Sequence, residues 1–283
     1  MKWQGRRESD NVEDRRGLSG KQVAFGGGGF ALILLIIGWL MGGDPQQLIS
    51  NFQQRTSQAT SAQGSRAQND NEKAMASYLR VTLADNETIW TKLFQENGMQ
   101  YQKPVLVMFD NVTQSPCGNA SSQTGPFYCP ADRKIYLDMA FFFFLNQRLG
   151  AHGDFAVAYV LSHEAAHHVQ FLLGTTQKIQ SAQQRSDKAT ANKLSVALEL
   201  QADFFAGVWA HYNQKLNGVL EDGDIEEALS AANAVGDDRL QKRAQGYVVP
   251  DAFTHGTSEQ RMYWFKLGYT TGDLNQGNTF QGL

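Results

Sequence analysis

A run of residues without any charge, 23–41 (VAFGGGGFALILLIIGWLM), constrains this chain more than any other feature of its sequence. Its length is close to the ~20 apolar residues that a helix needs to cross the hydrocarbon core of a bilayer. Cations such as Arg16 and Lys21 precede the run, and Asp44 follows it. By the positive-inside rule we expect a single-pass signal-anchor helix over 23–43, with the N-terminus in the cytoplasm and the later residues outside it.

Two other interpretations of the run stay open. A cleaved signal peptide would have a small-residue cleavage site, and none of the A-x-A type follows the run. A buried core helix would normally have amphipathic neighbours, which this segment lacks. The four glycines at 26–29 also weaken the N-terminal part of the helix.

The run divides the chain into segments of different character. Residues 1–22 are polar and carry both signs of charge, so we expect a cytoplasmic tail that cannot fold by itself. Residues 44–71 are rich in Gln, Ser, Asn and Thr, which is typical of a flexible linker. We expect one packed domain over 72–283.

Composition excludes several classes of protein. The formal net charge of −3 argues against a nonspecific nucleic-acid binder, so no nucleic-acid partner is expected. Two cysteines are too few for an Fe–S cluster or a zinc site held by four thiolates. A chain of 283 residues that is 42% hydrophobic can bury a sizeable core.

The periodicity of apolar residues predicts a helix-rich α+β domain with a small sheet. Strands come early in the domain and helices come late, which is the usual order of that class. We expect strands at 104–109 (PVLVMF) and 134–138 (KIYLD), and helices at 72–97, 154–173, 188–215, 221–234 and 257–267.

The sequence His163-Glu-Ala-Ala-His167 is an H-E-x-x-H motif. On a helix, positions four apart share a face, so both imidazoles can bind one zinc ion. Glu164 lies at the edge of that face, where it can take a proton from a water molecule as a general base. The preceding FAVAYVLS predicts a buried helix. The alternative is a pair of core histidines with an exposed glutamate, and His168 is a weaker candidate ligand.

A catalytic zinc site needs a third protein ligand and one open position. Glu199 and Asp203 are four apart in ELQADFFAGVWAHY, a mostly apolar helical segment. We expect Glu199 to be the third ligand and Asp203 to accept the N–H of a zinc-binding imidazole. The alternative is two ordinary surface carboxylates, but a buried unpaired carboxylate would be costly.

These motifs together resemble the gluzincins, zinc proteases with H-E-x-x-H followed by E-x-x-x-D on a later helix. The chain is also similar to the bacterial neutral zinc metallopeptidase family, the YpfJ-like membrane-anchored proteins. The matching segments are KWQGRRESDNVEDRR, GPFYCPADRKIYLD, LSHEAAHHVQ, ELQADFFAGVWAH and THGTSEQR. The resemblance implies one span, one zinc ion, a protein or peptide substrate, and a single-pass protein of the bacterial inner membrane with a periplasmic catalytic domain.

The two cysteines follow the run, on the side of the membrane where disulfides form. Closing Cys117 and Cys129 into a loop would contribute about 3 kcal/mol, and two free buried thiols are the alternative. The strand that follows contains Tyr136. In the resembled proteases such a strand is the sheet edge that pairs with an extended substrate, which makes Tyr136 a candidate substrate-binding residue. A purely structural strand is the other interpretation.

Peptide hydrolysis develops negative charge on the carbonyl oxygen, which needs stabilisation. His255 precedes the last predicted helix and Arg261 lies within it, in a segment that resembles the T-H-P…R of CAAX-prenyl and heat-shock membrane proteases, with Gly256 in place of the proline. We expect His255 to stabilise the oxyanion and Arg261 to bind substrate. A capping histidine and a structural ion pair are the alternatives, and Tyr247 and Tyr263 are weaker candidates.

The sequence therefore favours a membrane-anchored zinc metallopeptidase in which His163, His167 and Glu199 bind the metal and Glu164 is the base. A non-catalytic, zinc-stabilised binding module tethered to the membrane is the second hypothesis. The presence of Glu164 argues against it, because a structural metal needs no base beside it. A zinc hydrolase acting on a non-peptide substrate is a third.

Overall fold

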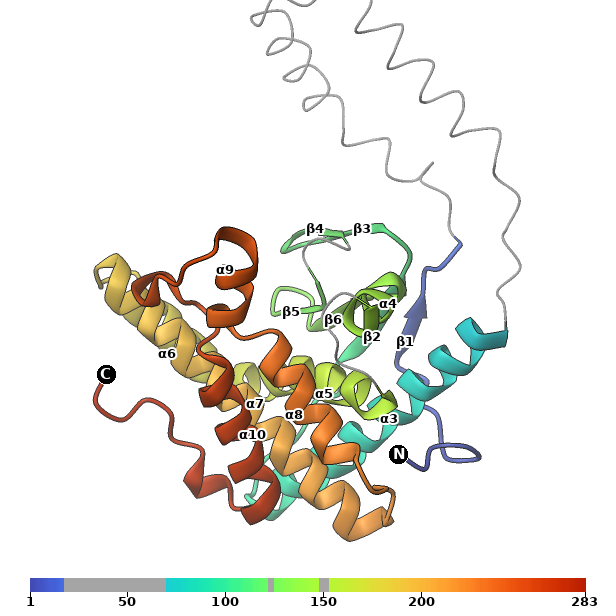
Figure 1. Ribbon diagram of the computed structural model, residues 1–283. Helices are drawn as coiled ribbons and strands as arrows, with labels where there is room; N and C mark the ends of the chain where they lie inside the picture. Colours follow the sequence, from blue (N-terminus) through green and yellow to red (C-terminus); the bar gives the residue numbers. More distant parts are fainter. Residues whose placement is uncertain (18–69, 122–124, 148–152) are drawn as a thin grey trace, which may run out of the picture. The chain divides into compact units, whose positions relative to one another are not determined.

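The computed structural model describes residues 1–17, 70–121, 125–147 and 153–283 (Figure 1). The membrane span expected over 23–43 and nearly all of the linker 44–71 lie outside the described residues. Among the helices that the structure does describe, none combines the length and the apolar character needed to cross a bilayer. The described chain is a helix-rich α+β fold with a small sheet, as the periodicity predicts.

The main sheet has four strands in the order β1-β2-β6-β5. The first three run parallel, and β5 closes the other edge antiparallel to β6. The two central strands are mostly apolar and are buried on both faces after their first residue, as parallel strands usually are. The strands of this sheet are β1 (Val12–Asp14), β2 (Val105–Phe109), β5 (Phe127–Cys129) and β6 (Lys134–Asp138). A separate hairpin joins β3 (Val112–Ser115) and β4 (Gly118–Ser121).

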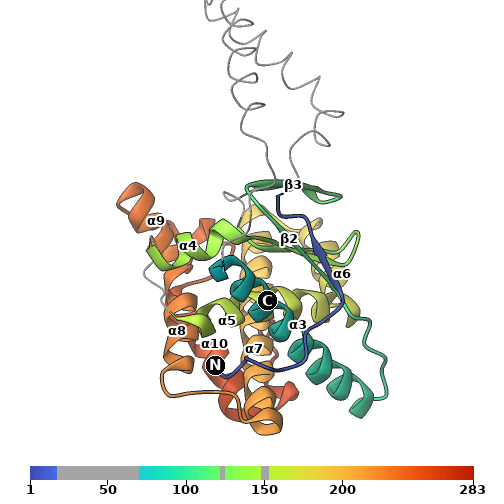
Figure 2. The same cartoon turned by 90° about the vertical axis from the view of Figure 1, so that its right-hand side faces the viewer.

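Helices make up most of the remaining described chain (Figures 1 and 2). They are α3 (Asp70–Glu96), α4 (Met139–Gln147), α5 (Asp154–Leu172), α6 (Thr175–Gln183), α7 (Lys188–Asn217), α8 (Asp224–Ala234), α9 (Asp237–Gln245) and α10 (Ser258–Thr271), with short 3₁₀ turns at Pro250–Ala252 and Leu274–Gln276. Helix α5 is buried on nearly every side, between the sheet and the later helices. Large side chains such as Trp90, Phe155 and Trp209 fill the core around it.

Helices α7 and α10 touch backbone to backbone. A Cβ added at Gly207 would lie 2.1 Å from the carbonyl oxygen of Phe265, and one at Gly268 would lie 2.1 Å from that of Phe204. Real carbon and oxygen atoms do not approach so closely, so only glycine fits at these two positions. The crossing brings the residues of α10 directly onto the helix that carries Glu199 and Asp203.

The N-terminal residues are part of this fold. Met1–Asp14 and Asn71–Leu283 form one compact unit, and Figure 2 shows the N-terminal segment passing across α3. The amino group of Met1 is surrounded by carboxylates, with oxygens of Asp154 and Asp224 each 3.1 Å away. We expected these residues to form a tail separate from the domain, but residues 1–14 pack against it. The segment has no apolar core of its own, and polar and charged side chains attach it to the domain.

Candidate metal centre

Helix α5 places the residues of the H-E-x-x-H motif. His163 is buried, and the ring centroids of His163 and His167 lie 4.8 Å apart, one helical turn from each other. Glu164 is 8% exposed. Within the described parts of the chain its carboxylate has no hydrogen-bond partner, so its oxygens are free to accept a proton.

Helix α7 brings the third residue to the same point. One carboxylate oxygen of Glu199 lies 3.1 Å from Nε2 of His163, and the other lies 3.4 Å from Nε2 of His167. One donor atom from each of the three residues lies within 4.8 Å of the others. Ligand atoms at the ~2.0–2.1 Å of zinc complexes are about 3.3 Å apart around a tetrahedron. The observed separations therefore suit one small cation at the centre of the three groups.

The hydrogen bonds of both imidazoles fix which nitrogen faces Glu199. Nδ1 of His163 lies 2.8 Å from the Asp203 carboxylate, which can only accept, so this nitrogen carries the proton. Nδ1 of His167 lies 2.9 Å from Oε1 of Gln170. The amide nitrogen of Gln170 donates to the carbonyl of Leu198, so its oxygen must be the atom that faces His167.

In the neutral tautomers, both Nε2 atoms thus present lone pairs to a carboxylate. Three electron-pair donors that face each other repel unless a cation lies among them. Burial alone would lower the pKa of His163, but Asp203 and Glu199 outweigh it and raise that pKa to about 10, so in the absence of a metal a proton on Nε2 supplies the positive charge between the ring and Glu199. The donor set of two imidazole nitrogens and one carboxylate is one that zinc commonly takes, so these residues fit the metal that the motif implies.

Arg261, the predicted substrate-binding residue, binds the Asp203 carboxylate in the structure. Its side chain is 4% exposed, and its Nε and an Nη atom donate to the two carboxylate oxygens of Asp203 at 2.8 and 3.0 Å. Tyr159 donates to the same carboxylate at 2.5 Å. Burial would raise the pKa of Asp203, but Arg261 and His163 lower it to about 2. Arg261 and Tyr159 thus hold the carboxylate that orients His163.

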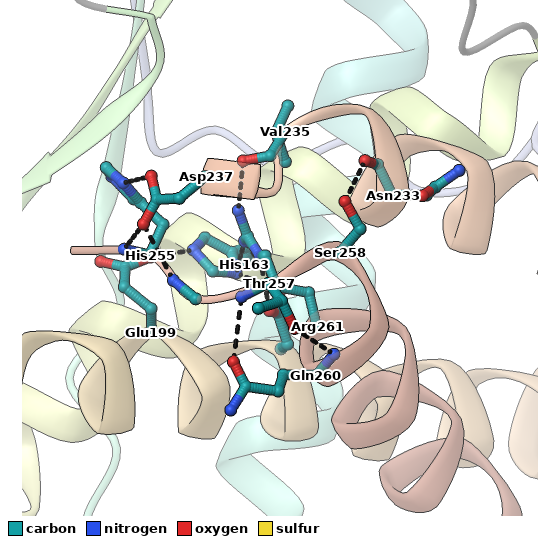
Figure 3. Close-up of polar contacts among 12 residues, drawn as sticks. His163, Glu199, Asn233, Val235, Asp237, His255, Thr257, Ser258, Gln260 and Arg261 are labelled. Carbon is teal, nitrogen blue, oxygen red and sulfur yellow. Dashed lines mark hydrogen bonds and ion pairs between the residues drawn. The ribbon is translucent and has the colours of Figure 1, made fainter. Parts of the chain in front are cut away.

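His255 lies at the rim of the site, with about half of its side chain exposed. The Asp237 carboxylate accepts the backbone N–H groups of His255 and its two neighbours, and lies 3.2 Å from Nδ1 of the ring. That hydrogen bond raises the pKa of His255, burial lowers it, and the Glu199 carboxylate raises it further. Figure 3 shows His255 and Glu199 on the same side of His163. Hydrogen bonds that Asp237 accepts from the backbone and the ring of His255 thus hold the imidazole beside the candidate metal ligands, and the pKa of the imidazole is raised.

Tyr136, the predicted substrate-binding residue, lies on an inner strand of the sheet and not on the edge strand that the sequence led us to expect. Its strand β6 pairs with β2 on one side and β5 on the other. The side chain is 1% exposed, stacks on Phe127 and donates to Asp132 at 2.6 Å. Strand β5, which has only three residues, takes the edge position instead. Such a short strand gives no periodic signal, which explains why the sequence pointed to β6.

The structure contains the Cys117–Cys129 disulfide that the sequence predicts. It joins the β3–β4 hairpin to β5 at the end of the sheet. His168 is fully buried and faces away from the candidate ligands. Its Nδ1 lies 2.9 Å from the hydroxyl of Tyr128, and its Nε2 lies 2.5 Å from the carbonyl of Gln102. Burial lowers its pKa to about 4. This neutral histidine connects α5 to β5 and is not a ligand.

Three residues of the site had no assigned role from the sequence. Tyr159 is four residues before His163 and Gln170 is three after His167, so the same helical spacing that identified the ligands places them on that face. Asp237 begins α9, and nothing in the local sequence connects it to His255. The alternative tyrosines, Tyr247 and Tyr263, are 62% and 58% exposed.

Comparison with known proteins agrees with this geometry. The family model described as "Putative neutral zinc metallopeptidase" matches residues 1–280. The Escherichia coli K12 protein named "Uncharacterized protein YpfJ" is 51% identical over 99% of both chains. The Mycobacterium tuberculosis H37Rv protein named "Uncharacterized protein Rv2575" is 43% identical over 71% of this chain and 70% of its own. No solved structure matches the chain. With a matched family model over nearly its whole length and relatives of this similarity, the chain belongs to the neutral zinc metallopeptidase family.

Proposed function

We propose that this protein is a zinc-dependent peptidase whose metal is bound by His163, His167 and Glu199. The observation that carries the proposal is the arrangement of the three side chains: Asp203 and Gln170 hold the Nδ1 atoms of the two imidazoles, so that both Nε2 atoms and the Glu199 carboxylate face one point. The unpartnered Glu164 beside that point favours catalysis over a purely structural metal site, which would need no adjacent base.

The residues of the chain have separable tasks in peptide hydrolysis. A zinc ion bound there would supply Lewis-acid activation of water and of the substrate carbonyl. Glu164 accepts a proton from the attacking water on its free carboxylate and returns it to the leaving nitrogen. Asp203 and Gln170 keep each imidazole in the tautomer that leaves Nε2 available.

His255 completes the site as a donor to the developing oxyanion. Its ring is partly exposed, its backbone is anchored on Asp237, and the same carboxylate favours the protonated imidazole. A cationic donor stabilises negative charge more strongly in the transition state than in the bound substrate, which is what accelerates the reaction.

An extended peptide is the substrate class that suits the sheet. Strand β5 is the terminal strand of the described sheet, and it packs against α5, which carries the motif. The hydroxyl of Tyr128 on β5 contacts His168, the residue after His167. A substrate strand added to the outer edge of β5 would therefore lie alongside the candidate metal centre.

Metal analysis and a cleavage assay test the proposal together. We expect one zinc per chain, cleavage of unstructured peptides, loss of cleavage with a chelator and recovery with added zinc. Glu199→Ala should lose most of the metal, whereas Glu226→Ala, the same change at an exposed position of α8, should not. Cleavage that a chelator does not reduce would contradict the proposal, and bound zinc without any cleavage would favour the binding module.

The pH profile tests the role of His255. If the protonated ring is needed, kcat/KM falls at alkaline pH as His255 loses its proton. The groups that act on it are Asp237 and Glu199, which raise its pKa, and Arg261, which lowers it. Asp237→Asn should move the alkaline limb to lower pH by about one unit, because a neighbouring negative charge is lost. Asp222→Asn, at an exposed position, is the control, and an unmoved limb in the first variant would exclude His255.

A further inference from the structure

The N-terminal segment supplies the partners of two buried carboxylates on α3. Asp85 is 6% exposed, and the guanidinium of Arg6 donates to its two oxygens at 2.7 and 2.8 Å. Asn213 of α7 adds a third hydrogen bond at 3.2 Å. Removing Arg6 would leave the buried Asp85 carboxylate without its counter-charge, and an unpaired buried charge strongly destabilises a fold.

Glu87 is still more buried, at 1% exposed. Its carboxylate accepts hydrogen bonds of 2.6 Å from the hydroxyl of Ser9 and from the side-chain amide of Asn11. Lys103 and Arg7 lie at 3.4 and 3.5 Å. The two shortest contacts of Glu87 therefore come from Ser9 and Asn11 of the N-terminal segment. These residues are two apart, so their side chains point the same way in an extended chain.

Backbone pairing continues along the same segment. The N–H of Ser9 donates to the carbonyl of Arg80, and the carbonyl of Asn11 accepts from Leu106. Strand β1 then pairs with β2 in parallel, with Val12 beside Leu106. The segment thus forms one edge of the sheet and covers part of α3, so it is an integral part of the domain that carries the candidate metal centre.

These contacts conflict with a single membrane crossing between the two parts. Between Asp14 and Asp70, the run 23–41 is the one stretch long and apolar enough to cross a bilayer, since 44–69 is polar and contains Arg55 and Arg66. One crossing would leave the N-terminal segment and the domain on opposite sides. We propose that residues 1–14 and the domain over 71–283 lie on the same side of the membrane, because the contacts between them leave no room for a bilayer between the two parts.

Cysteine labelling in intact cells tests the location directly. Asp10 and Lys242 are exposed and lie in the two parts of the full-length chain. Asp10→Cys and Lys242→Cys are made separately, and each is treated with a membrane-impermeant maleimide before and after permeabilisation, with the unsubstituted protein as background. We expect the same pattern at both positions. Reaction of one in intact cells while the other reacts only after permeabilisation would overturn the proposal.

A double-mutant cycle tests the pairing in the purified full-length protein. Arg6→Gln and Asp85→Asn should each lower the Tm, and the double variant should lose less than the sum, because the two residues form one pair. Lys2→Gln, which removes a charge of the segment whose side chain is exposed, should leave the Tm unchanged. If Arg6→Gln left the Tm unchanged and the Tm changes of the two single variants simply added in the double variant, the segment would not bind the domain. That result would also overturn the proposal.

Discussion

Glu164→Gln should lower kcat/KM for peptide cleavage by about 10²–10⁴-fold, the usual contribution of a general base. Glutamine has nearly the same shape but cannot accept a proton from water. Glu164 has no hydrogen-bond partner among the described residues, so it does not take part in the hydrogen bonds that orient His163 and His167. The variant should therefore keep the fold and the metal while losing the chemical step.

The measurement pairs single-turnover cleavage with zinc content and Tm for the same preparation. Glu226→Gln, an isosteric change at an exposed position of α8, is the matched control and should behave like the unmodified protein. Cleavage by Glu164→Gln at the normal rate would show that another group takes the proton. Loss of zinc together with activity would instead make Glu164 a ligand or a support for one.

Arg261→Met should lower the free energy of unfolding by about 3–5 kcal/mol, because it leaves the fully buried Asp203 carboxylate without its counter-charge. Methionine keeps much of the apolar volume of the arginine stem, so the effect measures the lost charge rather than a cavity. Arg239→Met, at an exposed position of α9, is the control and should change stability little. Urea unfolding at neutral pH gives both values.

The double variant Arg261→Met/Asp203→Asn separates charge from packing. It removes the unpaired charge, so we expect it to recover a large part of the lost stability. It should not recover catalysis, because a neutral amide does not hold the His163 tautomer as the carboxylate does. A double variant as unstable as the sum of its parts would show that the arginine acts through packing.

Local patterns predicted the helices and the residues of the metal centre for one physical reason. Long helices repeat their buried face every three to four residues, and the same spacing brings His163 and His167 together on α5. Glu199 and Asp203 follow the same rule on α7. The short elements gave no such signal, because β1 and β5 have three residues each and α9 has nine.

What the sequence did not reveal are the contacts between distant parts of the chain. Arg261 stands in a motif that resembles a substrate-binding segment, but its partner Asp203 is 58 residues away. Tyr136 lies on a strand that the sequence predicts, 134–138, whereas the edge is formed by β5, a strand of three residues that gives no periodic signal. The N-terminal residues contain few apolar side chains, so composition indicates a free tail, although Arg6, Ser9 and Asn11 bind carboxylates about 80 residues later.

Gly207 and Gly268 allow the close contact between α7 and α10, on which the geometry of the metal centre depends. Gly207 is one turn beyond Asp203 on α7, and Gly268 is two turns beyond Arg261 on α10. A methyl group at either position would push the helices apart and lengthen the hydrogen bonds between Arg261 and Asp203. Asp203 in turn orients the ring of His163. The position of the proton on Nδ1 of His163 therefore depends on two glycines at a helix crossing outside the metal centre.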